Sequence, residues 1–307
     1  MMIAFILKRL AQSVAVLWIV YTCTFWLLMA TPGDPFVGQK QPPPAVIAAL
    51  KARYGLNNPW EAYWRYPINV LLRGDMGPTI SYSNWSVAAV IKNTLPVSMA
   101  LGAMALLIAM WLGTAAGILG AVFRRRWPDQ LITVGSLAAI SIPNFILGSV
   151  LLIIFAVDTS LLPSGGWGTL QQLILPATTL ALAYLAIVAR LMRTSTVDVL
   201  DTDYIRTAKA KGNTPMRIIS AHAAPNASLP VLAFLGPAAA GVLTGSFVVE
   251  KLFAVPGMGD VFVNACLDKD IPLVLGITMV YTVILIVMNL LADIACAMAD
   301  PRVAISG

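Results

Sequence analysis

The chain has 307 residues, of which 59% are hydrophobic and 11% are charged, with a mean hydropathy of +0.82 and a formal net charge of +6. This composition excludes an ordinary soluble protein and indicates an integral membrane protein. The three cysteines have no close spacing, and the sequence contains no G-x-x-x-x-G-K-[ST], H-E-x-x-H or G-x-S-x-G motif. A disulfide framework, a metal site and nucleotide chemistry on this chain are therefore not expected.

Six apolar segments are long enough to cross the hydrocarbon core, which takes about 20 helical residues. None of them contains Lys, Arg, Asp or Glu, and they cover residues 10–30, 95–123, 131–157, 173–189, 229–249 and 271–292. The first is too long for the apolar region of a signal peptide and is interpreted as a retained helix. The predicted fold class is an all-α integral membrane protein with six transmembrane helices.

The expected organisation has three parts. Residues 1–30 form the N-terminus and the first transmembrane helix, and residues 31–94 form an extracytoplasmic helical segment. Residues 95–307 form the core, with five transmembrane helices and a cytoplasmic loop at residues 190–228.

The extracytoplasmic segment reads as two short helices after a rigid turn at residues 31–35. The first is expected around residues 46–54, with Gly55 as its C-terminal stop. The second has Pro67 as an expected kink and carries an apolar side: Trp60, Trp64, Ile68, Leu71 and Leu72. These aromatic residues are expected at the level of the lipid headgroups, with direct substrate or partner contact as the alternative.

The distribution of basic residues predicts the orientation, because Lys and Arg in short loops stay on the cytoplasmic side. Six spans place both termini on the same side. With the N-terminus inside, the cytoplasm holds 12 of the 20 basic residues but 6 of the 14 acidic ones. We therefore expect a multi-pass membrane protein with both termini in the cytoplasm.

The cytoplasmic loop contains the start and stop signals of two short helices that meet at an angle. Asp203 is placed to cap the first helix, and Gly212 can take the left-handed conformation that ends it. Thr214 and Pro215 suit the N-cap and first position of the next helix. Between Tyr204 and Arg217 the loop contains four basic residues and no acidic one. Composition alone also fits a solvated loop that is basic only for reasons of topology.

The spacing of Arg206-Thr-Ala208, Gly212 and His222 resembles the cytoplasmic "EAA" loop of ABC importer permeases. Arg206 and Thr207 stand where the general pattern has Glu and Ala, and His222 stands where it has an aliphatic residue. These departures resemble the peptide branch of the family, whose loops read R-T-A-x-A-K-G.

Other motifs agree with that branch in the correct order along the chain. They are the turn at residues 31–35, Gly74-Asp-Met-Gly77 with Thr79, Ser141-Ile-Pro-Asn-Phe145, the pattern Glu250, Phe253, Pro256-Gly257 and Gly259, and Asp300-Pro-Arg302. The chain thus resembles the B-type permease subunits of oligopeptide and dipeptide ABC importers, and it is most similar to the oligopeptide version.

The resemblance implies a type I importer permease fold and a non-enzymatic translocation subunit in the bacterial cytoplasmic (inner) membrane. The implied partners are a homologous C-type permease, two ATP-binding subunits that hold ATP and Mg²⁺, an extracytoplasmic peptide-binding protein, the peptide and membrane lipid. No cofactor on this chain and no nucleic acid are implied. ATP-driven closure of the ATPase dimer would rock the two permeases between inward-open and outward-open states.

The resemblance also implies roles for particular residues. Residues of the cytoplasmic loop would couple the permease to the ATPase: Asp203, Tyr204, Ile205, Arg206, Thr207, Ala208, Lys209, Ala210, Lys211, Gly212, Arg217 and His222. A second set would line a gate or the translocation path: Ser141, Pro143, Asn144 and Phe145. A third would contact the binding protein or shape the outer loops: Asp75, Trp85, Glu250, Pro256 and Gly257.

Several alternatives stay open at the level of sequence. Pro143 fits either a static kink or a gating hinge, and His222 fits a structural or docking role or, less well, a pH sensor. A face of small residues at Gly236, Ala238–Ala240, Gly241 and Gly245 indicates close helix packing. The cargo could be a dipeptide, an opine, a peptide antibiotic or a nickel chelate. A secondary transporter or intramembrane enzyme would need ionisable residues at membrane depth, which the six segments lack.

Overall fold

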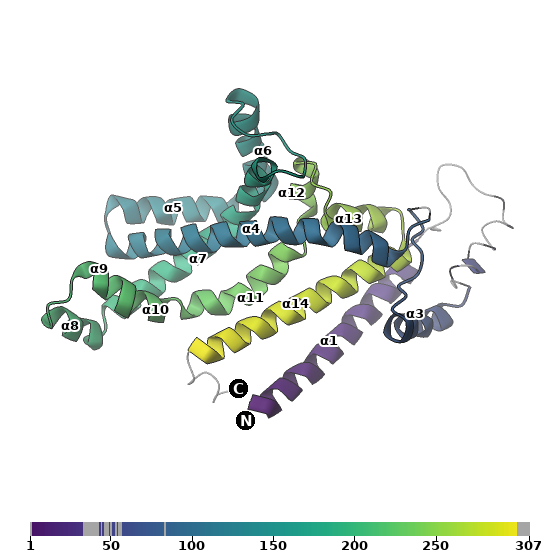
Figure 1. Ribbon diagram of the computed structural model, residues 1–307, viewed down its shortest axis with the longest axis horizontal. Helices are drawn as coiled ribbons and strands as arrows, with labels where there is room; N and C mark the ends of the chain where they lie inside the picture. Colours follow the sequence, from purple (N-terminus) through teal and green to yellow (C-terminus); the bar gives the residue numbers. More distant parts are fainter. Residues whose placement is uncertain are drawn as a thin grey trace. The chain divides into compact units, whose positions relative to one another are not determined.

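The computed structural model describes residues 2–32, 43, 45, 49, 51, 52, 54, 57–82 and 84–299. The chain divides into two compact units, each discontinuous in sequence. The first unit is Met1–Ser98 with Gly257–Ile286, and the second is Met99–Pro256 with Val287–Gly307. Two of the three boundaries fall inside the long helices α4 and α14, which Figure 1 labels, and the third lies between Pro256 and Gly257.

The first unit contains α1 (Met2–Ala30), α3 (Pro59–Arg73), the start of α4 (Val87–Val122), α13 (Met258–Leu267) and the start of α14 (Ile271–Ala299). The second contains the rest of α4 and α14 and the elements between them: α5 (Trp127–Ser141), α6 (Asn144–Leu152), the π-helix η1 (Ile153–Asp158), α7 (Leu170–Leu200), α8 (Asp203–Ala210), α9 (Pro215–Arg217), the π-helix η2 (Ile218–Ala223), α10 (Ala224–Ala227), α11 (Leu229–Leu243) and α12 (Phe247–Leu252).

Four straight helices in the described part of the chain are long and apolar enough to cross a membrane, within α1, α4, α7 and α14. Two bent pairs bring the number to six when each is counted as one span. The first pair covers α5, α6 and η1, and the second runs from Pro215 through α11 with a bend of 51°. Counted in this way, the described residues contain the six expected spans, and the all-α membrane fold class is confirmed.

The third span is not the single helix that the apolar run predicted. Helix α5 stops at Ser141, Ile142 is extended, and α6 begins after Pro143 at an angle of 107°. Proline lacks a backbone N–H, and it disfavours helical geometry in the residue before it. Pro143 therefore separates two helices and does not kink one.

The fourth and fifth spans also differ from their expected bounds. Helix α7 continues eleven residues beyond Ala189, so Arg190 and Arg193 lie on a helix and not in a loop. A charged residue near a helix end does not stop the helix when its head can reach the interface. Helix α11 ends at Leu243, six residues early, because Gly245 takes the left-handed conformation (φ 90°) before α12.

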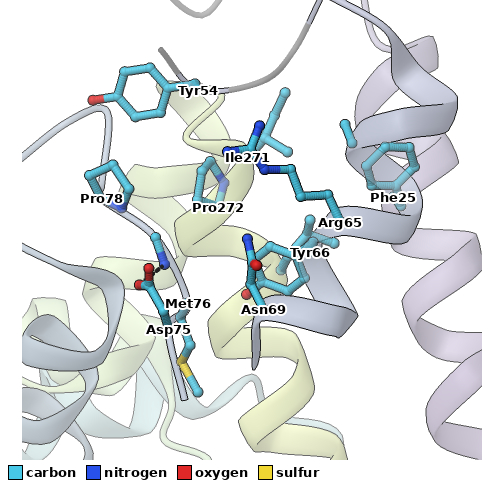
Figure 2. Close-up of a pocket in the computed structure, with 13 residues that line it drawn as sticks. Phe25, Tyr54, Arg65, Tyr66, Asn69, Asp75, Met76, Pro78, Ile271 and Pro272 are labelled. Atoms are coloured by element: carbon cyan, nitrogen blue, oxygen red, sulfur yellow. Dashed lines mark hydrogen bonds between the residues drawn. The ribbon is translucent and has the colours of Figure 1, made fainter. Parts of the chain in front are cut away.

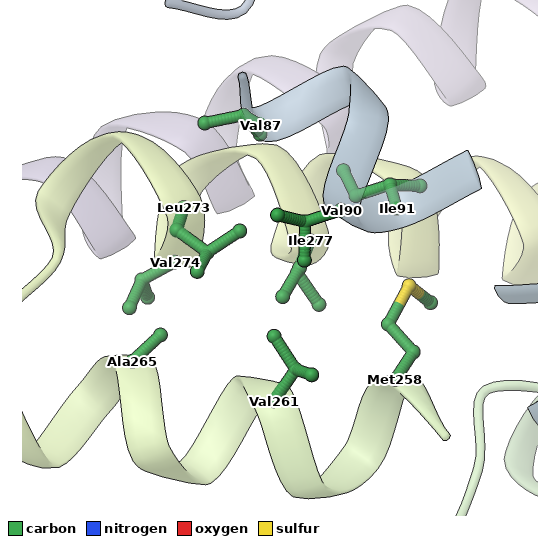
Figure 3. Close-up of a cluster of buried hydrophobic side chains, with 9 residues drawn as sticks. All are labelled: Val87, Val90, Ile91, Met258, Val261, Ala265, Leu273, Val274 and Ile277. Atoms are coloured by element: carbon green, nitrogen blue, oxygen red, sulfur yellow. The ribbon is translucent and has the colours of Figure 1, made fainter. Parts of the chain in front are cut away.

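The first unit is held together by an apolar cluster between the starts of α4 and α14 and helix α13 (Figure 3). Val87 and Ile91 of α4, Met258 and Val261 of α13, and Leu273 of α14 are all buried in it. Gly276 lies against this cluster, since a Cβ there would collide with Val87. The sequence analysis did not predict α13, whose ten residues are too few to span a membrane.

Helix α3 packs on α1 through aromatic rings. Tyr63 is buried between Tyr21 and Phe25, with ring centroids 5.2 and 5.4 Å away. The Tyr21 hydroxyl donates to the Tyr63 carbonyl at 2.6 Å, and the Thr22 and Tyr63 hydroxyls are 2.8 Å apart. Helix α3 runs on through Pro67 to the left-handed Gly74 (φ 64°). This contact places α3 beside the first span.

Small residues allow close packing in the second unit, as expected. A Cβ on Gly117 of α4 would lie 2.6 Å from the Ala189 carbonyl oxygen of α7. One on Gly236 of α11 would lie 2.7 Å from the Ala292 side chain of α14. A Cβ on Gly241 of α11 would lie 2.8 Å from the Tyr184 hydroxyl of α7. These approaches fix α4, α11 and α14 against their neighbours.

Some expectations fall outside the described residues. They include the turn at Gly33-Asp-Pro35, the prolines 42 and 44, most of the expected outer helix with Val46, Ile47 and Leu50, its stop at Gly55, and the terminal Asp300-Pro-Arg302.

Candidate functional site

The expected coupling helix is present as α8, and its boundaries follow local sequence signals. Gly212 has φ 76° and its N–H donates to the Lys209 carbonyl at 3.0 Å, which ends the helix as predicted. Thr214 accepts from the Arg217 N–H at 3.4 Å and Pro215 opens α9, also as predicted. At the other end the N-cap position belongs to Thr202, so the assignment of Asp203 as the cap is wrong.

Asp203 is instead the first residue of α8, where its negative charge favours the positive end of the helix dipole. Its carboxylate accepts from the Arg206 guanidinium at 2.8 Å. Both side chains are highly exposed, so this ion pair contributes little to stability. The charges on this turn are therefore available to a partner.

One side of α8 is buried against the second unit. Ile205 and Ala208 pack with Ile218 and Ala223 of the segment that leads to α11, and with Val199 at the end of α7. Burying this apolar surface at about 25 cal/mol per Å² holds α8 to both helices. A displacement of α8 must consequently move α7 and the base of α11.

The opposite side of α8 is exposed and basic. It presents Tyr204, Arg206, Thr207, Lys209, Ala210 and Lys211, followed by Gly212 and, beyond the turn, Arg217. The Tyr204 hydroxyl donates to the His222 carbonyl at 3.3 Å and accepts from the Asn226 amide at 2.9 Å. His222 thus contributes its main chain to this site.

A second connection joins α7 to the start of α5. Arg193 donates to buried Asp129 through Nε and, at 2.7 Å, through Nη2. The other donor to Asp129 is the Arg125 N–H, at 2.9 Å. Nearby, Arg124 and Asp201 form an exposed pair at 3.1 Å. These contacts tie the turn between α4 and α5 to the helix that carries α8.

The expected gate residues surround the break between α5 and α6. Ser141, Pro143 and Phe145 are exposed in the single chain, and Asn144 is partly buried. One turn further on, a Cβ on Gly148 would lie 2.8 Å from Thr179 of α7 and from Leu252 of α12. The break is therefore followed by a helix that is packed on one side, while Ile146 and Val150 on its other side are exposed like the side chains of the turn.

The Glu250 motif forms a corner inside the second unit. Glu250 is fully buried, so its side chain offers no surface to a binding protein. Phe253 is also buried, and its carbonyl accepts from the Gly166 N–H at 2.8 Å. Pro256 is exposed, while Gly257, in the first unit, is buried and precedes α13. Glu250 and Gly257 are thus structural, and Pro256 is the exposed member.

The Gly74 motif forms an outer loop of the first unit. Asp75 is exposed and accepts from the Gly77 N–H at 2.8 Å, and Trp85 is half exposed. Behind the loop, fully buried Asp270 accepts from the N–H groups of Ile80 and Ser81, at 2.8 and 2.9 Å.

Asp270 also accepts from the Leu273 N–H at 3.2 Å, and so caps α14. Burial raises the pKa of its carboxyl group, although these backbone hydrogen bonds oppose that effect. The sequence analysis missed Asp270. An acidic residue directly before an apolar span is the signal of an N-cap and would have found it.

Comparison with known proteins gives consistent results. Residues 112–305 match the family described as binding-protein-dependent transport system inner membrane component, and residues 2–102 match its N-terminal counterpart. The oligopeptide transport system permease protein OppB of Haemophilus influenzae is 42% identical over 98% of this chain and 99% of its own length. OppB of Escherichia coli is 38% identical over 98% and 99%.

The dipeptide transport system permease protein DppB of Bacillus subtilis is 40% identical, over 98% of each chain. Among solved structures, the inward-facing MetNI methionine ABC transporter matches with a TM-score of 0.53. It has 17% identity and covers 69% of this chain and 96% of that one, which supports the fold alone.

Proposed function

Because the chain belongs to the family of binding-protein-dependent transport system inner membrane components, we propose that it is the B-type permease of an ABC importer for oligopeptides. The observation that carries the proposal is similarity to oligopeptide permeases over 98% of the chain. The multi-pass helical fold supports it. The chain itself is a translocation subunit without enzymatic activity, and it works by alternating access.

The importer also contains a C-type permease, two ATP-binding subunits and an extracytoplasmic peptide-binding protein. The exposed basic side of α8 is the surface that docks on an ATP-binding subunit, which holds ATP and Mg²⁺. Arg206, Lys209 and Lys211 give that surface its charge, and exposed ion pairs formed there contribute under about 1 kcal/mol each. Position and rigidity of α8 therefore matter more than any one charge.

Movement of α8 reaches the membrane helices through its buried side. Ile205 and Ala208 transmit it to the base of α11, and the pair between Arg193 and Asp129 carries it from α7 to α5. Because packed cores switch between discrete arrangements, a small displacement at α8 becomes a rigid-body movement of these helices.

The turn at Ser141–Phe145 lines the gate, since most of its side chains are exposed, while Gly148 packs α6 against α7 and α12. On the outer side, Asp75 and Trp85 of the first unit are exposed and form a surface for the binding protein. Pro256 of the second unit is exposed as a separate contact, and Glu250 supports its loop from within.

Uptake of labelled di-, tri- and pentapeptides by cells that depend on this permease tests the proposal. We expect uptake of tri- and pentapeptides that stops when the gene is deleted. Uptake of dipeptides alone would favour the alternative, a dipeptide permease, which the 40% identity to DppB motivates. ATP turnover by the purified single chain, or uptake without an ATP-binding subunit, would contradict the proposal that ATP is hydrolysed by partner subunits.

A further inference from the structure

A cleft of about 160 Å³ lies in the first unit, beside α3 and the outer end of α14 (Figure 2). Its polar lining comes from Arg65, Tyr66 and Asn69 of α3 and from Asp75 in the loop that follows. Its apolar lining includes Phe25 of α1 and Leu275 of α14. Of the residues that line it, only Asp75 has a role in the functions described above, in the surface proposed for the binding protein.

The cleft offers separate positive and negative groups. Arg65 and Asp75 lie apart on its wall (Figure 2), and these two described residues form no ion pair with each other. The Gly77 N–H fixes the Asp75 carboxylate at 2.8 Å. The Tyr66 hydroxyl is buried and has no hydrogen-bond partner among the described residues. Burial raises the pKa of Tyr66, so the hydroxyl stays protonated. Such a site suits a ligand with both an anionic and a cationic group.

The position of the cleft on α14 indicates its level in the membrane. Ile271, Pro272 and Leu275 line it, and the candidate span of α14 begins at Ile271. The cleft therefore lies at the outer end of a transmembrane helix, where lipid headgroups meet the hydrocarbon core.

Helix α3 presents an exposed apolar face next to the cleft. Its members are Trp60, Trp64, Ile68, Leu71 and Leu72. Leu71 and Leu72 are 82% and 80% exposed, which an aqueous surface disfavours and the acyl boundary of a bilayer accepts. Arg65 and Leu72 are seven residues apart, so they lie on the same side of the helix. Arg65 thus borders the apolar face and reaches the cleft.

We propose that the cleft binds the headgroup of a zwitterionic phospholipid of the ethanolamine type from the outer leaflet. Arg65 and the Asn69 amide hold the phosphate, and Asp75 accepts from the ammonium group. Phe25 and Leu275 contact the glycerol end of the lipid, whose acyl chains run along the apolar face of α3. A peptide has the same two charged groups at its ends, but the adjoining lipid-facing surface favours the phospholipid.

The test titrates the purified full-length chain in detergent with dihexanoyl phosphatidylethanolamine, and bound lipid is counted by native mass spectrometry. Dihexanoyl phosphatidylglycerol, which lacks the ammonium group, is titrated in parallel. We expect the ethanolamine lipid to bind at least about tenfold more tightly, since a hydrogen bond to a charged group supports a difference of that size.

Arg65→Gln and Asp75→Asn should each weaken binding of the ethanolamine lipid about tenfold. Arg73→Gln is the matched control, because Arg73 is an exposed cation on the same helix that does not line the cleft. It should bind like the unmodified chain.

Three results would overturn the proposal. The first is equal affinity of the unmodified chain for the two lipids. The second is equal affinity of the Arg65→Gln and Arg73→Gln variants for the ethanolamine lipid. The third is displacement of the lipid by triglycine at comparable concentration, which would assign the cleft to soluble zwitterions.

Discussion

Arg193 donates two hydrogen bonds to Asp129, a residue 64 positions earlier in the chain, and this pair joins α7 to α5. Both helices belong to the second unit, which also contains α8. In the proposed mechanism, this contact is part of the route by which docking at α8 changes the positions of the transmembrane helices.

Asp129→Asn should destabilise the protein, because it leaves the Arg193 guanidinium without its counter-charge. Arg193 is partly exposed, so we expect a loss of about 1–3 kcal/mol, less than for a fully buried pair. Thermal aggregation of the purified chain measures it. Asp201→Asn breaks the exposed pair with Arg124 and should cost under about 1 kcal/mol. Equal effects of the two substitutions would contradict the structural role of the Arg193 pair.

Gly212→Val should uncouple transport, because a β-branched residue at φ 76° is strained by about 1–2 kcal/mol or more and deforms the end of α8. Gly168→Val is matched, since Gly168 is also exposed with a positive φ (127°), and only the Gln172 carboxamide oxygen, at 4.0 Å, lies near a Cβ position. Both variants should lose similar stability, and only Gly212→Val should lose peptide-stimulated ATP hydrolysis by the assembled importer. Unchanged ATP hydrolysis in the Gly212→Val importer would contradict the proposal that α8 couples the permease to the ATP-binding subunit.

The exposed charges of α8 should be individually less important. Arg206→Ala removes a residue whose pair with Asp203 is highly exposed, so uptake should fall by less than about fivefold. Ala208→Phe should have a larger effect, because Ala208 is buried against Ile218 and a large side chain would push α8 off its base. Peptide uptake by cells that express equal amounts of each variant compares the two. A stronger effect of Arg206→Ala would reverse this order.

Single cysteines should report the topology in a chain whose native Cys23, Cys266 and Cys296 have been replaced by serine. Cysteines at Asn84 and Asp268, both exposed, should react with a membrane-impermeant thiol reagent added to intact cells. A cysteine at Arg126 should react only after the cells are opened. Labelling of position 126 in intact cells would contradict the orientation with both termini in the cytoplasm.

Asp270→Asn should change how stability depends on pH. The pKa of Asp270 is raised in the folded state, so the folded state binds more protons than the unfolded chain between the unfolded value of about 3.9 and the raised value. Stability from this group therefore falls as the pH rises through that window. Thermal aggregation between pH 4 and pH 7 should show this slope in the unmodified chain and a smaller one in Asp270→Asn. Identical slopes would show that Asp270 is not the responsible group.

Local signals in the sequence predicted α8 well, because its ends depend on residues adjacent in the chain. Gly212 supplies a left-handed stop, and Thr214 with Pro215 opens the next helix. Only the assignment of Asp203 missed by one position. Burial of Ile205 and Ala208, which makes α8 a rigid part of the unit, depends on packing that the short segment does not specify.

Apolar runs predicted the number of spans but not their shapes. The run through residues 131–157 conceals the break at Pro143, because hydropathy is the same on both sides of it. The predicted fourth span ends too early because the charge of Arg190 indicates the start of a loop. Hydropathy cannot show that Arg193, on the same continuing helix α7, forms an ion pair with Asp129 of α5. Contacts between residues so far apart in sequence leave no periodic signal.

The discontinuity of the first unit has a consequence for biosynthesis. Ile80 leaves the ribosome 190 residues before Asp270, the side chain that receives its N–H. At about 5–20 residues per second, roughly 10–40 s pass before that partner is made. During this interval α1, α3 and the start of α4 have been made without α13 and α14. A ribosome that stalls before residue 270 therefore leaves a segment whose Ile80 and Ser81 amides lack their acceptor and whose apolar core is unfilled.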